Sequence, residues 1–317
     1  MTNTSFLLTT VLVLTWASPV PPDQDLHVAH ARLEATWPMP QAAPDNRALP
    51  ADEQGAARRL AASTRRGEFV AVDIDGKPLT IWIVYPDRTE RAPVVVVIQE
   101  IFGLSDWVRG VADQLAAEGF IAVAPDLISG YGPNGGDTRS MATRDEIMQA
   151  TNKLSGMPAE IMSKLKAARA YGLSRPFASG RSASVGFCYG GNLSFELAIA
   201  EPALDAAVVF YGSAPGTWKP PAPGTFIPSD ALARIVAPVL ALYAEDDRPL
   251  TPTLAPTAAK LKELGKSYES HTFEGASHAF LREQSGHAGN NLKAAQRAWP
   301  LTITWLRKYT TFTEHTR

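Results

Sequence analysis

Continuous apolar runs, separated by helix-like stretches, are the feature that most constrains this chain of 317 residues. The run Val94–Ile98 ("VVVVI") contains no polar position, which is typical of a strand buried on both faces of a parallel sheet. Helical patterns follow this run and separate the later apolar runs from one another. Strands that alternate with helices predict an α/β fold, with a doubly wound, mostly parallel sheet flanked by helices. In such sheets, ligands bind beyond the carboxyl ends of the strands.

The residues before this region differ in composition. Residues 1–18 contain the apolar run "FLLTTVLVLTWA", which is too short to span a bilayer and predicts a signal peptide. Met1–Ser5 has no Lys or Arg, so an uncleaved N-terminal anchor and a wrong start codon are the alternatives. Residues 19–66 are rich in Pro and Ala and predict a tether, with a short helix capped by Asp52. We expect the folded domain over residues 67–317 of an exported protein, periplasmic or secreted.

Charge and cysteine content exclude several classes of function. The chain has 30 Lys and Arg against 32 Asp and Glu, a net charge of −2, so no overall field favours nucleic acid or an anionic membrane. Cys188 is the single cysteine, which excludes an intramolecular disulfide and a site built from several thiolates. No exposed apolar helix stands out, and we therefore expect a monomer without stable membrane association once a signal peptide is removed.

Cys188 lies in the pattern G-x-C-x-G ("GFCYG"), directly after the apolar run "SASV". Most free cysteines are small buried hydrophobes, and that is the alternative interpretation. A strand, this pattern and then a helix are typical of a nucleophile elbow, in which a tight turn presents the nucleophile above the sheet. Gly186 and Gly190 suit such a turn because side chains there would clash, and amides at the helix start favour a thiolate. We therefore predict that Cys188 is a nucleophile.

A nucleophile elbow requires an orienting carboxylate and a histidine, which follow the nucleophile in that order along the chain. His278 comes shortly after the predicted strand "SYESHTF", and the pair Asp246 and Asp247 comes directly after "APVLALYAE". Both sites lie at carboxyl ends of predicted strands, where the elbow also lies. His278 is the predicted base, while the residues alone leave Asp246 and Asp247 open.

Over residues 68–309, the chain resembles the dienelactone hydrolase family of α/β-hydrolases. The likeness is carried by four stretches: "QEIFGLSDWVRGVADQLAAEGFIAVAPDL", "VGFCYGG", "YAEDDRPLTP" and "FEGASHAFLR". The resemblance implies the α/β-hydrolase fold, and a small-molecule ester or lactone as the partner. The mechanism it implies needs no metal and no organic cofactor. It also places the catalytic acid at Asp247, with Ala244 standing where the family usually has glycine.

The resemblance assigns further roles beside the triad. Glu100 is expected near the resting thiol, from which substrate would displace it; a solvated loop carboxylate is the alternative. The backbone amides of Ile101 and Tyr189 are expected to hold the oxyanion. Phe102, in the same loop, is expected to contact substrate.

Arg282 lies four residues after His278, in "HAFLR". If this stretch forms one helical turn, the two side chains share a face. By resemblance, an arginine at this offset binds a carboxylate of the substrate, whereas an exposed arginine is the alternative. Arg144 is a candidate for the family's second arginine, and Ala279 stands where a hydroxyl residue often follows the histidine.

These features predict a hydrolase that cleaves lactones or carboxylic esters through a Cys-His-Asp triad and a thioester acyl-enzyme. A thiolate is a good leaving group, so activated esters and lactones suit this chemistry better than amides. A broader carboxylesterase or an acyl-peptidase on the same fold is one alternative. A non-catalytic binding protein with this fold is another.

Overall fold

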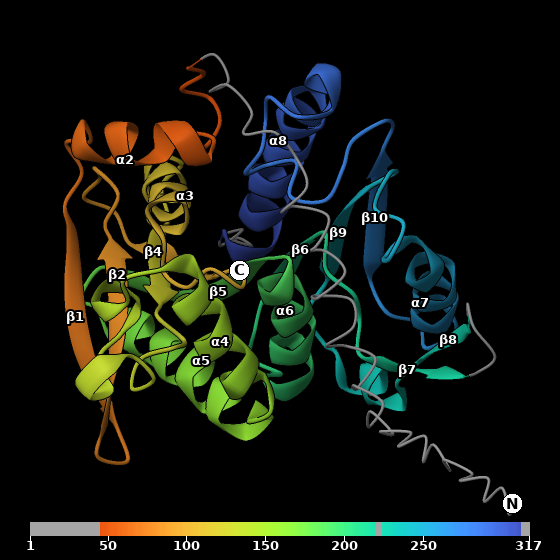
Figure 1. Cartoon of the computed structure of the whole chain (residues 1–317), viewed down its shortest axis with the longest axis horizontal. Helices are drawn as coiled ribbons and strands as arrows, with labels where there is room; N and C mark the ends of the chain where they lie inside the picture. Colours follow the sequence, from red (N-terminus) through yellow and green to blue (C-terminus); the bar gives the residue numbers. More distant parts are fainter. Residues whose placement is uncertain (1–44, 220–223, 312–317) are drawn as a thin grey trace, which may run out of the picture.

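An eight-stranded sheet forms the centre of the molecule (Figure 1). The computed structural model describes residues 45–219 and 224–311. The strands of this sheet are β1 (Gly67–Ile74), β2 (Lys77–Val84), β3 (Ala92–Ile98), β4 (Ile121–Pro125), β5 (Ala178–Phe187), β6 (Ala206–Phe210), β9 (Val239–Ala244) and β10 (Tyr268–Phe273). Their order is β1-β2-β4-β3-β5-β6-β9-β10. Strand β2 is antiparallel to β1 and β4, and every other neighbouring pair is parallel, which confirms the predicted sheet.

Helices cover both faces of this sheet (Figure 1). One face carries α3 (Asp106–Ala117) and α8 (Asn290–Thr310), with α2 (Glu53–Ala61) packed on α3. The other face carries α4 (Arg144–Ser155), α5 (Pro158–Leu173) and α6 (Tyr189–Ala200). Beyond the sheet's last strand lie α7 (Thr251–Glu263) and a small antiparallel pair, β7 (Gly216–Lys219) and β8 (Thr225–Pro228). Short 3-10 turns are η1 (Pro133–Gly135), η2 (Thr138–Ser140), η3 (Asp230–Arg234) and η4 (His287–Gly289).

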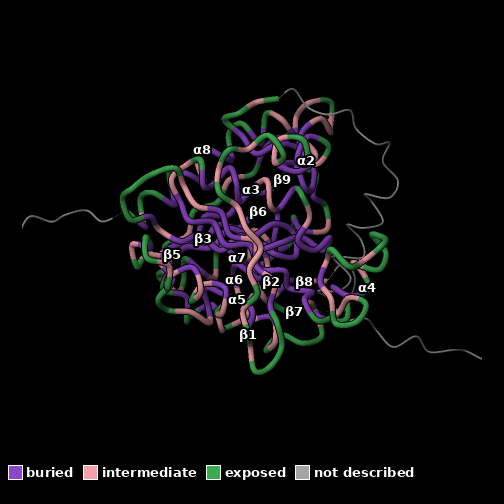
Figure 2. The backbone as a smooth tube through the Cα atoms, turned by 90° about the vertical axis from the view of Figure 1, so that its left-hand side faces the viewer, coloured by how far each residue is buried: buried purple, intermediate pink, exposed green. Residues whose placement is uncertain are grey.

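Burial along the strands explains why the apolar runs became central strands. All residues of β4, β6 and β9 are buried, whereas the edge strand β1 has no fully buried position. Figure 2 shows the buried strands at the centre of the molecule, with exposed segments around them. A strand covered by helices on both faces must be apolar on both sides, and an edge strand need not be.

The turn between β1 and β2 is formed by Asp75 and Gly76, as the sequence predicted. Both residues have positive φ, 51° and 81°, which matches the turn that closes a two-residue hairpin. The Asp73 carboxylate accepts a hydrogen bond from the Gly76 amide over 3.0 Å. The hairpin adds the antiparallel edge to the parallel sheet.

The expectation of a tether over residues 19–66 is wrong for residues 45–66, which pack on the domain. Leu49 and Ala56 are only 2% and 1% exposed and belong to the main hydrophobic core. The predicted short helix is present as α2, and the Asp52 side chain caps it by accepting from the Gly55 amide over 2.8 Å. The few apolar residues of this segment are buried against α3. The sequence of the segment has no sustained apolar period and therefore did not predict this packing.

Polar contacts also tie this segment to the domain. The Arg65 guanidinium binds the Asp113 carboxylate of α3, with Nη2 and Oδ2 2.6 Å apart, and Gln114 donates to the carbonyl of Arg47 over 3.2 Å. The domain therefore begins by residue 45. Residues 1–18 and 19–44, predicted as signal peptide and tether, lie outside the described residues.

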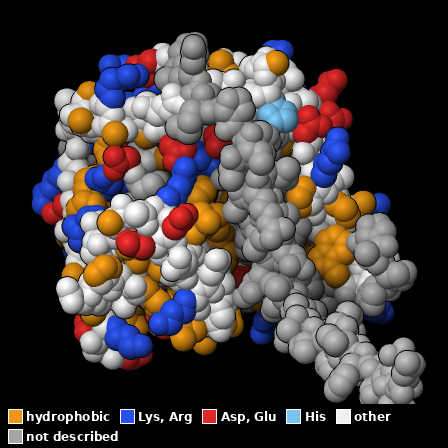
Figure 3. Space-filling view, viewed as in Figure 1, with side chains coloured by type: hydrophobic (Ala, Val, Ile, Leu, Met, Phe, Trp, Pro, Cys, Tyr) orange, Lys and Arg blue, Asp and Glu red, His pale blue; other side chains and the backbone are white. Residues whose placement is uncertain are grey.

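The face of the molecule in Figure 3 carries interleaved acidic and basic side chains. This pattern agrees with the near-balanced charge of the sequence. Among the described residues, no helix combines the length and the apolar character that crossing a bilayer requires.

Candidate active site

Cys188 stands on the sharp turn between β5 and α6. Its backbone has φ 53° and ψ −116°, a conformation that L-residues rarely adopt. The turn is held at both ends, because the Cys188 amide donates to the Phe210 carbonyl over 3.1 Å and the Cys188 carbonyl accepts from the Gly191 amide over 2.9 Å. Strain of this kind is characteristic of a nucleophile elbow. Cys188 directly follows β5, at the carboxyl end of that strand, and is 5% exposed.

Glycines flank this turn because no side chain fits there. A Cβ at Gly186 would overlap the Gly190 carbonyl, and a Cβ at Gly190 would overlap the carbonyls of Ile98 and Gln99 at the end of β3. The α6 backbone therefore approaches β3 and β5 at close range. This approach directs the N-terminal end of α6 at the cysteine.

His278 and Asp247 form a buried pair close to the elbow. Nδ1 of His278 lies 2.7 Å from Oδ2 of Asp247, and their side chains are 6% and 1% exposed. Asp246 instead lies at the surface with its side chain 50% exposed, 3.5 Å from Nδ1 of His287. The geometry thus brings Asp247, and not Asp246, to His278.

The charge state of His278 depends on both neighbours. Burial of the ring disfavours the imidazolium, but the negative charges of Asp247 and Cys188 outweigh burial and raise the pKa of His278 well above 6.5. Cys188 is therefore a close neighbour of the His278 ring. The arrangement therefore favours the positively charged form of the His278 ring.

Glu100 lies two residues beyond β3 and is 2% exposed. Its Oε2 is 2.6 Å from Nε of Arg282, which is also 2% exposed, so the predicted alternative of a solvated loop carboxylate is wrong. Arg282 follows a tight turn in which its amide donates to the Ala279 carbonyl over 2.8 Å. It is buried among carboxylates, so the alternative of an exposed arginine is also wrong.

The loop that contains Ile101 is fixed by hydrogen bonds to other segments of the chain. Gln99 accepts from the Leu127 amide over 3.1 Å, and Thr151 of α4 donates to the Ile101 carbonyl over 3.0 Å. Tyr189 is the first residue of α6, and amides in the first turn of a helix have no carbonyl partner within that helix. The two predicted oxyanion positions thus border the elbow from β3 and from α6.

Phe102, Arg144 and Arg282 come together at one point. The guanidinium carbons of Arg144 and Arg282 lie 3.8 and 5.0 Å from the centre of the Phe102 ring. Glu53 of α2 binds both arginines, over 2.8 Å to Nη2 of Arg144 and 2.6 Å to Nη1 of Arg282. Glu283 contacts Arg282 as well, at 3.0 Å.

Comparison with known proteins assigns this constellation to a family. The dienelactone hydrolase family profile matches residues 79–310, which is most of the chain and includes the elbow, the acid turn and the histidine. The chain belongs to the dienelactone hydrolase family. Membership of this family makes the protein a carboxylic ester hydrolase with the α/β-hydrolase fold.

Relatives of this dienelactone hydrolase family member cover most of its length. A protein of Saccharolobus solfataricus named as a carboxymethylenebutenolidase is 28% identical over 263 residues, which are 74% of this chain and 96% of the relative. A protein of Methylorubrum extorquens with the same name is 31% identical over 224 residues, 68% of this chain and 72% of the relative. A Klebsiella pneumoniae crystal structure assigned as a dienelactone hydrolase covers 78% of this chain and 100% of its own, with 23% identity and a TM-score of 0.64.

Two residues of the site were missed by reasoning from the sequence of this family member. Tyr211 directly follows β6, is 1% exposed, and its ring lies edge-on to the His278 ring with centroids 5.0 Å apart. Burial, followed by the neighbouring charge of Glu100, raises the pKa of Tyr211 well above its usual value, so the hydroxyl stays neutral. Its position at the carboxyl end of a buried strand was an available signal. Glu53 gave no such signal, because it lies in a segment interpreted as a tether.

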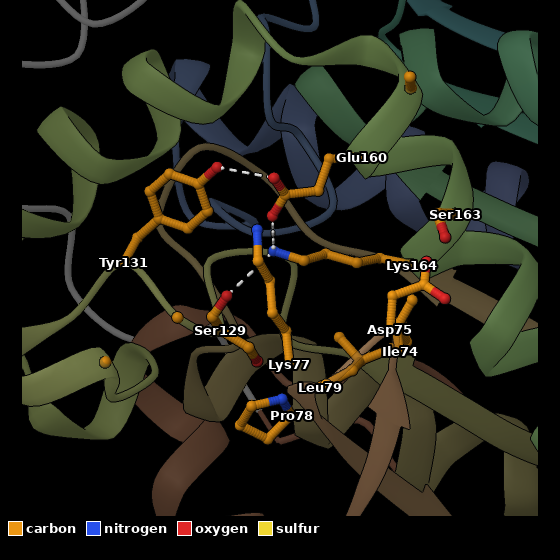
Figure 4. A pocket seen from close by; sticks show the side chains of 14 residues that line it. Ile74, Asp75, Lys77, Pro78, Leu79, Ser129, Tyr131, Glu160, Ser163 and Lys164 are labelled. Carbon is orange, nitrogen blue, oxygen red and sulfur yellow. Dashed lines mark hydrogen bonds and ion pairs between the residues drawn. The ribbon is translucent and has the colours of Figure 1, made fainter.

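A cavity of about 580 Å³ lies beside the β1–β2 hairpin, and its lining does not include Cys188, Asp247 or His278 (Figure 4). Glu160 accepts from Lys164 over 2.8 Å and from the Tyr131 hydroxyl over 3.0 Å. Lys164 also donates to the Ser129 carbonyl over 3.0 Å. Tyr131, Glu160 and Lys164 are thus joined by hydrogen bonds across this cavity. Within residues 45–219 and 224–311, no group of three or more His, Cys, Asp or Glu side chains is arranged to hold a metal ion.

Proposed function

We propose that this protein hydrolyses small lactones or carboxylic esters through Cys188, His278 and Asp247, with a thioester acyl-enzyme as the intermediate. The observation that carries the proposal is the buried pair of His278 and Asp247, beside which Cys188 stands on a strained turn close enough to affect the pKa of the His278 ring. A nucleophile, a base and an orienting carboxylate in this order are what acyl transfer requires.

In the first half of the proposed reaction, the Cys188 thiolate attacks the carbonyl carbon of the substrate. The carbonyl electrons move to oxygen, and the amides of Ile101 and Tyr189 stabilise the resulting oxyanion. When the tetrahedral intermediate collapses, the C–O bond to the alkoxide breaks and the alkoxide takes a proton from the His278 imidazolium. The products are a thioester on Cys188 and an alcohol, which stays attached to the acyl group if the substrate was a lactone.

In the second half, neutral His278 takes a proton from water as the oxygen attacks the thioester carbon. Collapse of this second intermediate expels the Cys188 thiolate and releases the carboxylic acid. Asp247 stabilises the imidazolium that forms in each cycle and holds the ring in one orientation. The ion pair of thiolate and imidazolium is then restored.

Glu100 has a proposed role in the resting enzyme. We assign it a position near the thiol, where Arg282, 2.6 Å away, holds the carboxylate until substrate displaces it. Tyr211 lies beside Glu100 and contacts the His278 ring, and we propose that its neutral hydroxyl holds this carboxylate in place.

The test is hydrolysis of a chromogenic short-chain ester by the pure protein and by Cys188→Ala. We expect turnover that is lost in the variant and is abolished in the wild type by one equivalent of a thiol alkylator, while the thermal unfolding midpoint changes little. Substantial turnover by Cys188→Ala would rule out the assignment of the nucleophile. Absence of turnover with esters, lactones and acyl-peptides alike would favour a binding protein.

We also propose that the protein is exported, as the N-terminal apolar run predicts, and that it is a monomer. Mass spectrometry of the protein from its native host should find an N-terminus beyond Ala17. An intact Met1 in a cytoplasmic fraction would contradict export. Light scattering of the pure protein should give a mass near that of one chain.

A further inference from the structure

Glu53 joins the two arginines beside the active-site loop. One carboxylate oxygen lies 2.8 Å from Nη2 of Arg144, and the other lies 2.6 Å from Nη1 of Arg282. Both guanidinium groups lie over the ring of Phe102. A single carboxylate that binds two guanidinium groups in this way occupies the position that the carboxylate of an anionic ligand would take.

The backbone fixes Glu53 in this position. The Glu53 amide donates to the Arg282 carbonyl over 2.9 Å, and the Gln284 side chain donates to the Pro50 carbonyl over 2.8 Å. Asp52 caps α2 at the same point. The start of α2 is thus bound to the segment that follows His278, and Glu53 is held against the arginines by the fold.

The arginine pair is connected to the reacting groups. Arg282 binds Glu100 through Nε, and Glu100 immediately precedes Ile101, a proposed oxyanion donor. Phe102 is the next residue of the same loop. A group bound between Arg144 and Arg282 therefore lies beside the proposed acyl site.

We propose that Glu53 is a specificity-determining residue, whose carboxylate fills the anion position between Arg144 and Arg282 and makes the enzyme favour uncharged esters and lactones over carboxylated ones. This inference rests on the proposed function, because it concerns the selection of substrates at the same site.

The formal charge of the groups around Arg144 and Arg282 supports this preference for uncharged substrates. Three carboxylates, those of Glu53, Glu100 and Glu283, surround two guanidinium groups, which leaves the cluster with a formal charge of −1. A substrate carboxylate would meet this negative cluster and would also have to displace an intramolecular partner, which is present at a high effective concentration. Removal of Glu53 would bring the formal charge to zero and vacate the position.

Glu53→Ala tests the inference with two substrates of similar size and shape, of which one carries a negative charge and the other is neutral. We would measure kcat/KM for a carboxymethylene butenolide and for its primary amide, in the wild type and in the variant. The ratio of the anionic to the neutral substrate should rise at least about fivefold in Glu53→Ala, as expected when charged hydrogen bonds become available. A smaller rise, or a fall, would overturn the inference.

Two control variants separate the effect of filling the position between Arg144 and Arg282 from the effect of removing a negative charge elsewhere. Glu283→Ala removes a carboxylate that lies 3.0 Å from Arg282, while Glu53 still bridges both arginines. Its effect on the ratio should be clearly smaller than that of Glu53→Ala, and an equal rise would overturn the inference. Glu68→Gln removes one charge from an exposed pair with Arg66 on β1, and it should leave the ratio unchanged.

A binding measurement keeps the inference separate from the proposed reaction. In a Cys188→Ala background, calorimetry would compare 2-furoate with the neutral 2-furamide, before and after Glu53→Ala. Furoate should bind at least about fivefold more tightly after the substitution, with little change for furamide. Unchanged furoate affinity would overturn the inference even if the enzyme hydrolyses esters. Tighter furoate binding would support it even if Cys188 proves not to be the nucleophile.

Discussion

Nε of Arg282 lies 2.6 Å from Oε2 of Glu100, and the two side chains are 2% and 3% exposed. The pair joins the segment that follows His278 to the loop that follows β3. These two segments are 182 residues apart in the chain, from position 100 to position 282. A buried ion pair of this kind holds both sides of the site in one geometry.

Glu100→Gln should destabilise the fold and slow the reaction. The substitution leaves a buried guanidinium without one of its carboxylates, and Glu53 and Glu283 compensate only in part, so we expect a loss of about 1–3 kcal/mol in the free energy of unfolding. Denaturant unfolding measures this loss. The control Glu90→Gln, in an exposed pair with Arg88, should change stability by less than about 0.5 kcal/mol. Equal stability of the two variants would contradict a structural role for the buried pair.

His278→Ala should change the pH dependence of Cys188 alkylation. The raised pKa of His278 means that its positive charge is present below 6.5 and is lost only as pH rises through the higher folded pKa. In the wild type this charge favours the thiolate at neutral pH. Iodoacetamide labelling followed over pH should therefore require a higher pH in His278→Ala. Superimposable profiles would show that the imidazolium does not activate the thiol.

Asp247→Asn should reduce kcat by roughly a thousandfold or more, since an amide holds the wrong tautomer of the histidine and cannot stabilise its charge. Asp246→Asn is the matched control, because its carboxylate lies at the surface near His287. We expect a loss of less than about tenfold for this neighbour. Steady-state kinetics on one ester would compare the two, and a larger loss in Asp246→Asn would assign the acid to the other residue.

Gly190→Ala should disrupt the elbow. The added Cβ would overlap the carbonyls that end β3, so α6 would have to move, and we expect a loss of about 3 kcal/mol or more in stability. Gly110→Ala, on α3, places its Cβ 3.9 Å from Ala56 and should stabilise the protein by about 0.5–1 kcal/mol. Thermal unfolding and ester hydrolysis would distinguish Gly190→Ala from Gly110→Ala. Wild-type stability in Gly190→Ala would mean that the close approach is not required.

The sequence by itself determined the features that depend on neighbouring residues. A continuous apolar run bounded by helical patterns is typical of a strand covered on both faces, and the glycines around Cys188 are required by a turn that the chain makes within five residues. Asp75-Gly76 closed the β1–β2 hairpin for the same local reason. The elbow, the mostly parallel sheet and the positions of Asp247 and His278 at strand ends could therefore be predicted from the order of residues alone.

Only the tertiary structure decided which distant side chains meet. It chose Asp247 over Asp246 at His278, and it placed Tyr211 beside the His278 ring. It also carried Glu53 to Arg282, 229 residues away. These contacts depend on how α2 and the loops pack over the sheet, and residues so far apart leave no periodic pattern in the chain. For this reason the N-terminal segment resembled a tether in sequence, although its carboxylate binds the arginines beside the active site.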